Sequence, residues 1–458
     1  MNDTTPSTGL NRGLQNRHIQ LIALGGAIGT GLFLGSASVL KSAGPSMILG
    51  YAITGLIAVL MLRQLGEMVA EEPVSGSFSH FANRYWGAFP GFLCGWNDWV
   101  LHVLVGMAEL TAVGVYVQFW WPEVPAWLTA LLCFIAINGI NLINVRSFGE
   151  TEFWFTLVKV AAVIGMILFG GYLLVSGQGG PQASLSNLWT DGGFFPNGIE
   201  GLFMMLAVIM FSFGGLEVIG MTAAEAVTPG KTLPRAFNQV IYRILIFYIG
   251  SLLILLSLYP WSQVAAGGSP FVMIFMQIGA STTAHILNFV VLTAALSVYN
   301  CTTYADSRML YSLACQGNAP AVFRKLDRNG IPVNATLFSA LATSGCVILN
   351  YVFPGKALGM LMSLVVAATV INWMMISLIH FRFRKARAGQ PSVFPAIAYP
   401  LGNVVCLIFM LTILGILLNT PDMAASVYVL PLWLLALWFG YCITGKKREA
   451  AELAKQTS

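Results

Sequence analysis

Gly25-Gly26-Ala27-Ile28-Gly29-Thr30-Gly31 interrupts one long apolar run of the sequence, and Phe211-Ser212-Phe213-Gly214-Gly215-Leu216-Glu217 interrupts another. Lipid offers no water to satisfy backbone polar groups, so a broken helix persists at membrane depth only where it lines a cavity. Paired breaks in two halves of a chain indicate the substrate site of a transporter. Glycines that only allow close helix packing would explain either stretch alone, but explain the pair less well.

The composition identifies the class of protein. Of 458 residues, 57% are hydrophobic and 9% are charged, whereas soluble domains carry roughly 25% charged residues. Runs of about 20 apolar residues are long enough to cross a bilayer. Twelve such spans are predicted, near 19–40, 46–68, 90–118, 125–144, 154–176, 198–222, 236–259, 284–312, 334–353, 357–381, 402–419 and 426–443. The third and eighth are long enough to extend beyond the membrane.

Basic residues predict the orientation of these spans. With both termini in the cytoplasm, all but Lys41, Lys356 and the intramembrane Lys159 of the 23 lysine and arginine residues lie at or near the cytoplasmic side, as topology rules require. We therefore expect a multi-pass membrane protein with both termini in the cytoplasm. The net charge of +5 reflects this topology and requires no nucleic-acid partner. Residues 1–17 are polar and carry no cleavable signal pattern, so we expect the first span to be retained.

The order of the spans predicts an internal repeat. The sixth span follows the first by an odd number of spans, so the two cross in opposite directions, as in inverted repeats. The expected division is a cytoplasmic tail 1–17, repeat 1 over 18–177, an extracellular linker 178–197, repeat 2 over 198–383, accessory helices 400–444 and a cytoplasmic tail 445–458. Scattered cysteines without metal-ligand spacing predict neither a metal site nor a disulfide framework.

The breaks predict a receptor for a zwitterion. Unwinding at the first break frees amide groups near Thr30 and Gly31, and the start of a half-helix attracts a carboxylate. Unwinding at the second break frees carbonyl groups near Phe211 and Gly214, which can accept hydrogen bonds from an ammonium group. No cofactor is expected.

Ionisable residues within spans are costly and mark functional positions. Asp98, His102 and Glu109 fall on one face of the third span with Gly106, and this face is expected to point into the bundle. Glu109 and Lys159 are candidates for proton coupling, since a buried lysine can lose and regain a proton near neutral pH. A structural ion pair or a lysine that reaches the membrane surface is the alternative for Lys159.

Glu217 follows the second break directly, and two roles remain open for it. Its carboxylate can bond freed backbone amides and hold the two broken helices together, or it can itself take up a proton.

Several long motifs resemble one family. Residues Gly13 to Phe33, Gly66-Glu67-Met68, Pro73 to Phe78, Gly149 to Phe155 and Phe213 to Glu217 look like bacterial amino-acid permeases of the amino acid–polyamine–organocation superfamily. The resemblance covers nearly the whole chain and is greatest to aromatic amino-acid and phenylalanine permeases. It implies an all-α membrane protein with a LeuT-like fold, a 5+5 inverted repeat in which helices 1 and 6 are broken.

The resemblance also implies roles for the residues at the breaks. The substrate carboxylate would meet Thr30 and Gly31, and its amino group the backbone of Ala27, Phe211 and Gly214. These residues, with Ile28, Gly29, Phe213, His102 and Gly106, form the predicted substrate site. Phe211 and Phe213 match an aromatic gate or pocket wall, and Lys159 matches a lysine that replaces a sodium ion. Ser297 and Asn300 would face the same region.

One stretch departs from the aromatic permeases. Those proteins usually carry further aromatic residues after Gly-Trp-Asn, whereas this chain continues Gly95-Trp96-Asn97-Asp98-Trp99-Val100-Leu101-His102. Asp98 and His102 are therefore candidates for substrate selectivity that would favour histidine or tyrosine over phenylalanine. The alternative, of equal weight, is that Asp98 and His102 hydrogen-bond only to each other and leave the selectivity unchanged.

These features together predict a proton-coupled symporter that imports phenylalanine, tyrosine or tryptophan by alternating access. A permease for histidine or another bulky neutral amino acid is one alternative, and an amino-acid exchanger or a transporter-like sensor is another. No catalytic constellation supports an enzyme. The expected partners are the amino acid, the proton gradient and the bilayer; the oligomeric state stays open, and a monomer is compatible with the sequence.

Overall fold

The computed structural model describes residues 29–74, 76–143, 145–221, 234–239, 242, 244–264, 268–388 and 390–445. Every regular element within these ranges is helical. The predicted tail 1–17, residues 446–458 of the other tail, and the predicted site residues Ala27 and Ile28 lie outside the described residues.

Eight helical runs are long and apolar enough to cross a membrane. They are Gly31–Glu71, Ala88–Gln118 (α5), Phe148–Ser176 within α7 (Val145–Ser176), Ser281–Cys315 (α13), Val333–Val352, Ala357–Ala386 (α16), Leu401–Asn419 (α17) and Pro421–Ile443 (α18). Three shorter apolar helices are Ala126–Asn141 (α6), Gly198–Phe211 (α8) and Leu245–Leu258. The last of these combines part of a π-helical turn, Ile244–Gly250, with α11 (Ser251–Leu258).

The run Gly31–Glu71 covers two of the predicted spans. The π-helical turn η1 (Gly31–Gly35) and α2 (Ser36–Ala43) precede the short turn η2 (Gly44–Ser46), and α3 (Met47–Glu71) follows it. Gly44 has a φ of 57°, a backbone conformation that glycine adopts without steric cost. The structure thus separates the two predicted spans at this glycine, while a total of twelve membrane crossings stays a prediction.

The second predicted break is confirmed. Helix α8 ends at Phe211, turns follow, and the helix resumes only as α9 (Val218–Met221). Gly215 has a φ of 85°, which explains why a glycine stands at this point of the turn. The first predicted break lies only partly within the described residues, which begin at Gly29; the turn η1 begins at Gly31.

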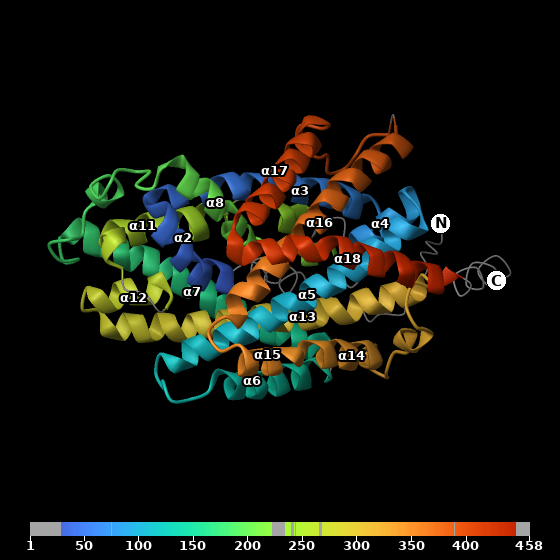
Figure 1. The fold of residues 1–458 in the computed structure, drawn as a ribbon, viewed down its shortest axis with the longest axis horizontal. Helices are drawn as coiled ribbons and strands as arrows, with labels where there is room; N and C mark the ends of the chain where they lie inside the picture. The colour runs from blue at the N-terminus through green and yellow to red at the C-terminus, as the bar shows by residue number, and fades with distance from the viewer. Residues whose placement is uncertain are drawn as a thin grey trace.

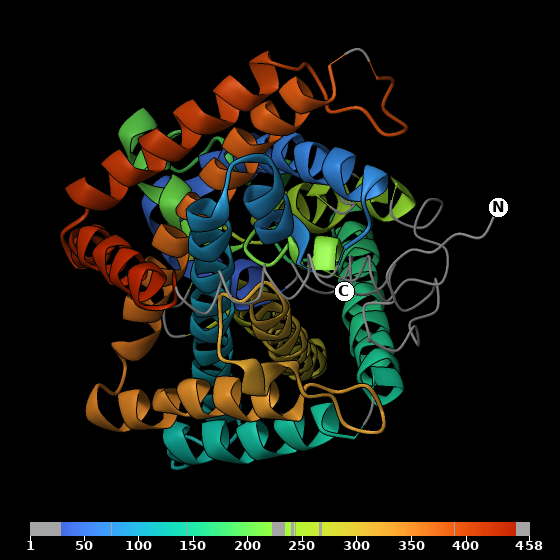
Figure 2. The ribbon, with the colours of Figure 1, turned by 90° about the vertical axis from the view of Figure 1, so that its right-hand side faces the viewer.

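Helices α5 and α13 lie together at the centre of the bundle (Figure 1). Small residues allow this contact, because a side chain at Gly95 would collide with Leu313, and one at Gly106 would press on Tyr299. Figure 2 looks along the bundle and shows α6 and the pair α14 (Val333–Thr343) and α15 (Gly345–Val352) as a layer on one side, with α17 on the opposite side. The central pair therefore offers its buried faces to the broken helices.

Helix α5 has 31 residues and α13 has 35. At about 1.5 Å per residue both exceed the roughly 30 Å of hydrocarbon in a bilayer, as expected for the third and eighth spans. The remaining described elements are connections: α4 (Ser77–Tyr85), η3 (Leu185–Leu188), η6 (Trp261–Gln263), α12 (Pro270–Gln277) and η7 (Ala321–Arg324).

Candidate functional site

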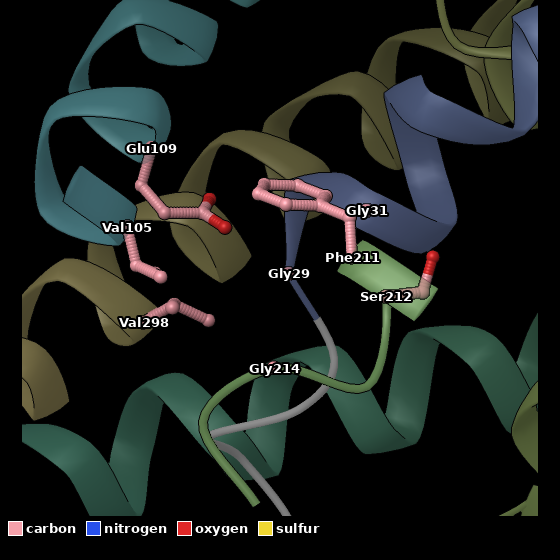
Figure 3. Close-up of a pocket in the computed structure, with 8 residues that line it drawn as sticks. All are labelled: Gly29, Gly31, Val105, Glu109, Phe211, Ser212, Gly214 and Val298. Carbon is pink, nitrogen blue, oxygen red and sulfur yellow. The ribbon is translucent and has the colours of Figure 1, made fainter. Parts of the chain in front are cut away.

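A cavity lies where the turn between α8 and α9 faces the start of η1 (Figure 3). Four segments line it with Gly29, Gly31, Val105, Glu109, Phe211, Ser212, Gly214 and Val298. Its volume is about 10 Å³, which is room for about one water molecule. The walls of the cavity must therefore move apart before an amino acid can enter.

Glycines allow the two broken segments to touch. A Cβ atom added at Gly31 would lie 2.5 Å from the Cα of Ser212, and one added at Gly29 would lie 2.7 Å from Oε1 of Glu109. The first of these neighbours is backbone, which cannot turn aside as a side chain can. Gly29 and Gly31 are therefore required by the close approach of their neighbours.

Glu109 binds the start of the first half-helix. Its two carboxylate oxygens accept the backbone N–H of Thr30 at 3.2 and 3.3 Å, and the Thr30 hydroxyl donates a further hydrogen bond. The Glu109 side chain reaches this position from α5 and points toward Phe211 (Figure 3). The Glu109 carboxylate thus accepts a hydrogen bond from the Thr30 amide, which the sequence analysis predicts to bind the carboxylate of the substrate.

Lys159 lies in the same buried region. Its side chain is fully covered by protein, and its charge acts on the carboxylates of both Glu109 and Glu152. Glu152 accepts hydrogen bonds from Ser297 at 2.5 Å and Asn300 at 3.3 Å. Because Lys159 is covered by protein, it does not extend to the membrane surface.

The two phenylalanines of the second break point in different directions. Phe211 lines the cavity, whereas Phe213 stacks on Tyr248 with ring centroids 4.8 Å apart and is not among the residues that line it. The Tyr248 hydroxyl donates to the Ser212 carbonyl at 2.7 Å. Phe211 is therefore placed to contact a bound side chain, and Phe213 instead anchors the turn against its neighbours.

Asp98 and His102 lie outside the cavity lining. His102 Nδ1 is 2.9 Å from the Asp98 carbonyl and 3.4 Å from the Asp98 carboxylate. Asn372 on α16 donates to Oδ1 of Asp98 at 2.9 Å. Gly106 also lies outside the lining and packs against Tyr299. In this conformation the pair fastens α5 to α16, and its effect on selectivity stays a prediction.

Replacement of Asp98 by asparagine should therefore lower stability without reordering substrates. The substitution removes the charge that Asn372 and His102 contact, and the loss of a buried hydrogen bond to a charged group costs about 1.5–3 kcal/mol. Thermal unfolding in detergent measures the loss, and competition between amino acids for uptake measures the order. His102→Tyr tests the other residue of the pair in parallel, and a changed order in either variant would restore the pair as selectivity residues.

Glu217 is fully buried, and its carboxylate oxygens have no hydrogen-bond partner among the described residues. The charges of Asp98 and His102 act on it. Asp306 on α13 is buried nearby, within the field of the same two residues. Neither predicted role of Glu217 is decided by these contacts.

Sequence reasoning missed several residues of this region. Ser212, Val105 and Val298 line the cavity, and Glu152 lies within the field of Lys159. Glu152 stands seven residues before Lys159, a spacing that places both on one helical face and offered a signal. No comparable signal exists for Val105 and Val298, because apolar residues fill most positions of their helices.

Comparison with known proteins places the chain in a family. A family model described as amino acid permease matches residues 18–454. The aromatic amino acid transport protein AroP of Escherichia coli strain K12 is 63% identical over 445 residues, which is 97% of each chain. AroP of Salmonella typhimurium strain LT2 is 63% identical over 434 residues, covering 94% of this chain and 95% of the relative.

A more distant relative agrees with this placement. The uncharacterized amino acid permease YtnA of Bacillus subtilis strain 168 is 42% identical over 450 residues, covering 96% of this chain and 97% of the relative. The apolar helices, the broken helix at the cavity and these similarities lead to one conclusion: the chain belongs to the amino acid permease family and is an integral membrane transporter.

Proposed function

We propose that this protein is a proton-coupled symporter that imports an aromatic amino acid by alternating access. The name of the relatives that are 63% identical, aromatic amino acid transport protein, supports the substrate class. The cavity beside Phe211 supports it as well, since an aromatic wall suits an aromatic side chain. Transport uses the proton gradient and no cofactor.

The proposed architecture is that of twelve spans in a 5+5 inverted repeat, with a LeuT-like arrangement. It places the protein in the bacterial inner membrane with both termini in the cytoplasm. Repeat 1 covers 18–177, repeat 2 covers 198–383, and residues 400–444 form two accessory helices. The distribution of basic residues supports this orientation.

The contact between Glu109 and Thr30 carries the proposal of proton coupling. An ionised Glu109 holds the Thr30 amide and hydroxyl, and these groups are the ones assigned to the substrate carboxylate. Protonation of Glu109 weakens its hold on both donors, which then become available to the amino acid. The positive charge of Lys159 acts on Glu109 and favours the ionised form of the carboxylate.

The proposal is tested by uptake of radiolabelled phenylalanine, tyrosine and tryptophan into proteoliposomes with an imposed pH gradient. Accumulation above the external concentration, abolished by a protonophore, is the expected result. Uptake that ignores the protonophore, yet proceeds by counterflow against internal amino acid, would identify an exchanger. Binding without flux would identify a sensor.

Histidine and other bulky neutral amino acids form the second candidate substrate class. The sequence difference at Asp98 and His102 motivates it, because these polar residues replace aromatic residues that the resembling permeases usually carry; in this conformation both lie outside the cavity lining. If histidine is a substrate, an equal concentration of unlabelled histidine should reduce the uptake of labelled phenylalanine. If the protein is specific for aromatic amino acids, phenylalanine uptake should stay unchanged.

A further inference from the structure

A second pocket lies beside the first half-helix, at the end of α5 that the proposed topology places outside. It has a volume of about 140 Å³ and is lined by α5, α12, α13 and the residues preceding α12. Phe271 of α12 packs edge-on against Phe33 of η1 with ring centroids 5.1 Å apart. The rim residues Gln118 and Phe119 are half-buried. The pocket is large enough for several water molecules.

Two residues that line this pocket, Tyr116 and Ser269, carry buried hydroxyl groups. Tyr116 and Ser269 are each 2% exposed, and neither hydroxyl makes a hydrogen bond of normal distance and angle to a described residue. Asn288 binds the Tyr116 carbonyl at 2.8 Å and leaves the phenol hydroxyl untouched. Buried polar groups are normally satisfied by protein or by ordered water. Two such hydroxyls on one pocket wall therefore indicate a place for water.

Tyr116 connects this pocket to the substrate site. It stands seven residues after Glu109 on α5, so both side chains share one face of the helix. Side chains on a helix lean toward its N-terminus, which brings the Tyr116 ring down toward Glu109. The Tyr116 hydroxyl lies near the Thr30 side chain and in the field of the Glu109 carboxylate.

We propose that this pocket is the entry point for the coupling proton, and that the Tyr116 hydroxyl passes the proton to Glu109 through Thr30. The inference rests on the proposed symport. A hydronium ion in the pocket gives a proton to the Tyr116 oxygen and becomes water, while the Tyr116 O–H proton moves to the Thr30 oxygen. In the same step the Thr30 O–H proton moves to the Glu109 carboxylate. One proton enters and one arrives, and both hydroxyls end as they began.

The charged groups around Glu109 are consistent with an arriving proton. Lys159 acts on Glu109 from α7, and Glu152 lies within the field of Lys159 on the same helix. Thr30 faces the carboxylate from the first half-helix. A proton that neutralises Glu109 frees the Thr30 amide for substrate and leaves Lys159 with Glu152 as its remaining counter-charge. The proton and the amino acid thus approach the Thr30 region by separate routes.

The test compares Tyr116→Phe with the unchanged protein in proteoliposomes. Phenylalanine keeps the ring that fills the pocket wall and removes only the hydroxyl. We expect the initial rate of uptake driven by the pH gradient to fall about tenfold, because proton transfer by a positioned side chain speeds a step by at least that factor. Lowering the external pH should restore part of the rate. Exchange of labelled for unlabelled amino acid should stay at the original rate.

Tyr299→Phe is the matched control, because Tyr299 is also a buried tyrosine of the bundle and its hydroxyl binds Asn138 away from the pocket. It should keep the normal pH profile. Normal gradient-driven uptake by Tyr116→Phe would overturn the inference, and so would a parallel loss of exchange. Failure of the symport proposal would give a different result, because uptake by the unchanged protein would then not respond to the protonophore.

Discussion

Replacement of Lys159 by alanine is expected to abolish accumulation of the amino acid against its gradient. The lysine is fully buried, and its charge acts on the carboxylates of Glu109 and Glu152. Removing it takes away a positive charge that acts on two buried carboxylates, and leaving a buried charge uncompensated costs about 3–5 kcal/mol. Proteoliposome uptake with an imposed pH gradient measures the loss, and thermal unfolding shows how much protein stays folded.

Lys159→Arg separates the two possible roles of the lysine. Arginine keeps the positive charge and is not deprotonated in proteins. If Lys159 only neutralises the carboxylates, arginine should restore uptake; if it must also release a proton, the arginine variant should exchange amino acids but fail to accumulate them. Lys41→Ala, at an exposed position of α2, is the control and should transport normally. Undiminished accumulation by Lys159→Ala would refute a coupling role.

Gly31→Ala is expected to reduce uptake below about a tenth of the original rate. The added Cβ would lie 2.5 Å from the Ser212 Cα and 2.9 Å from its nitrogen, so the two broken segments must separate. Overpacking of this kind costs about 1–3 kcal/mol, and here it also displaces the amide groups that would bind the substrate. Uptake and ligand-induced thermal stabilisation both measure the effect.

Gly35→Ala is the matched control for this substitution, because it adds the same methyl group four residues further along the same helical run. Its nearest neighbour would be the Cε of Met362 at 3.2 Å, the end of a flexible side chain that can move. We expect nearly normal uptake and stability. If Gly31→Ala transports as well as Gly35→Ala, the close approach of the two segments is not needed during transport.

The broken helix at the second site could be predicted because its cause is local. Gly214 and Gly215 interrupt an apolar run, and the structure ends α8 at Phe211. The inward position of Glu109 could be predicted for the same reason, since a carboxylate in an apolar helix must avoid lipid. Its partner Thr30 lies 79 residues away, and no periodic pattern connects two such positions.

Asp98 and His102 show the limit of helical periodicity. They share a face with Glu109, but the cavity meets that face only at Val105 and Glu109. The two residues contact each other and Asn372 instead. Helical periodicity predicts the side of the helix on which a residue lies. It does not predict where along the helix a cavity forms, because that depends on the position of the neighbouring helices.

By itself the sequence determined the apolar helices, the glycine break after Phe211 and the family, because hydropathy, backbone freedom and ordered motifs are properties of neighbouring residues. Only the tertiary structure decided which buried groups meet: Glu109 with Thr30, Lys159 near Glu152, and Tyr116 between an outer pocket and Glu109. Glu109 and Thr30 come from different segments, and the outer pocket joins α5 to α12 and α13, whereas Lys159 and Glu152 share α7. The contacts between segments depend on the rotation and height of each helix in the bundle, which packing of the whole chain sets.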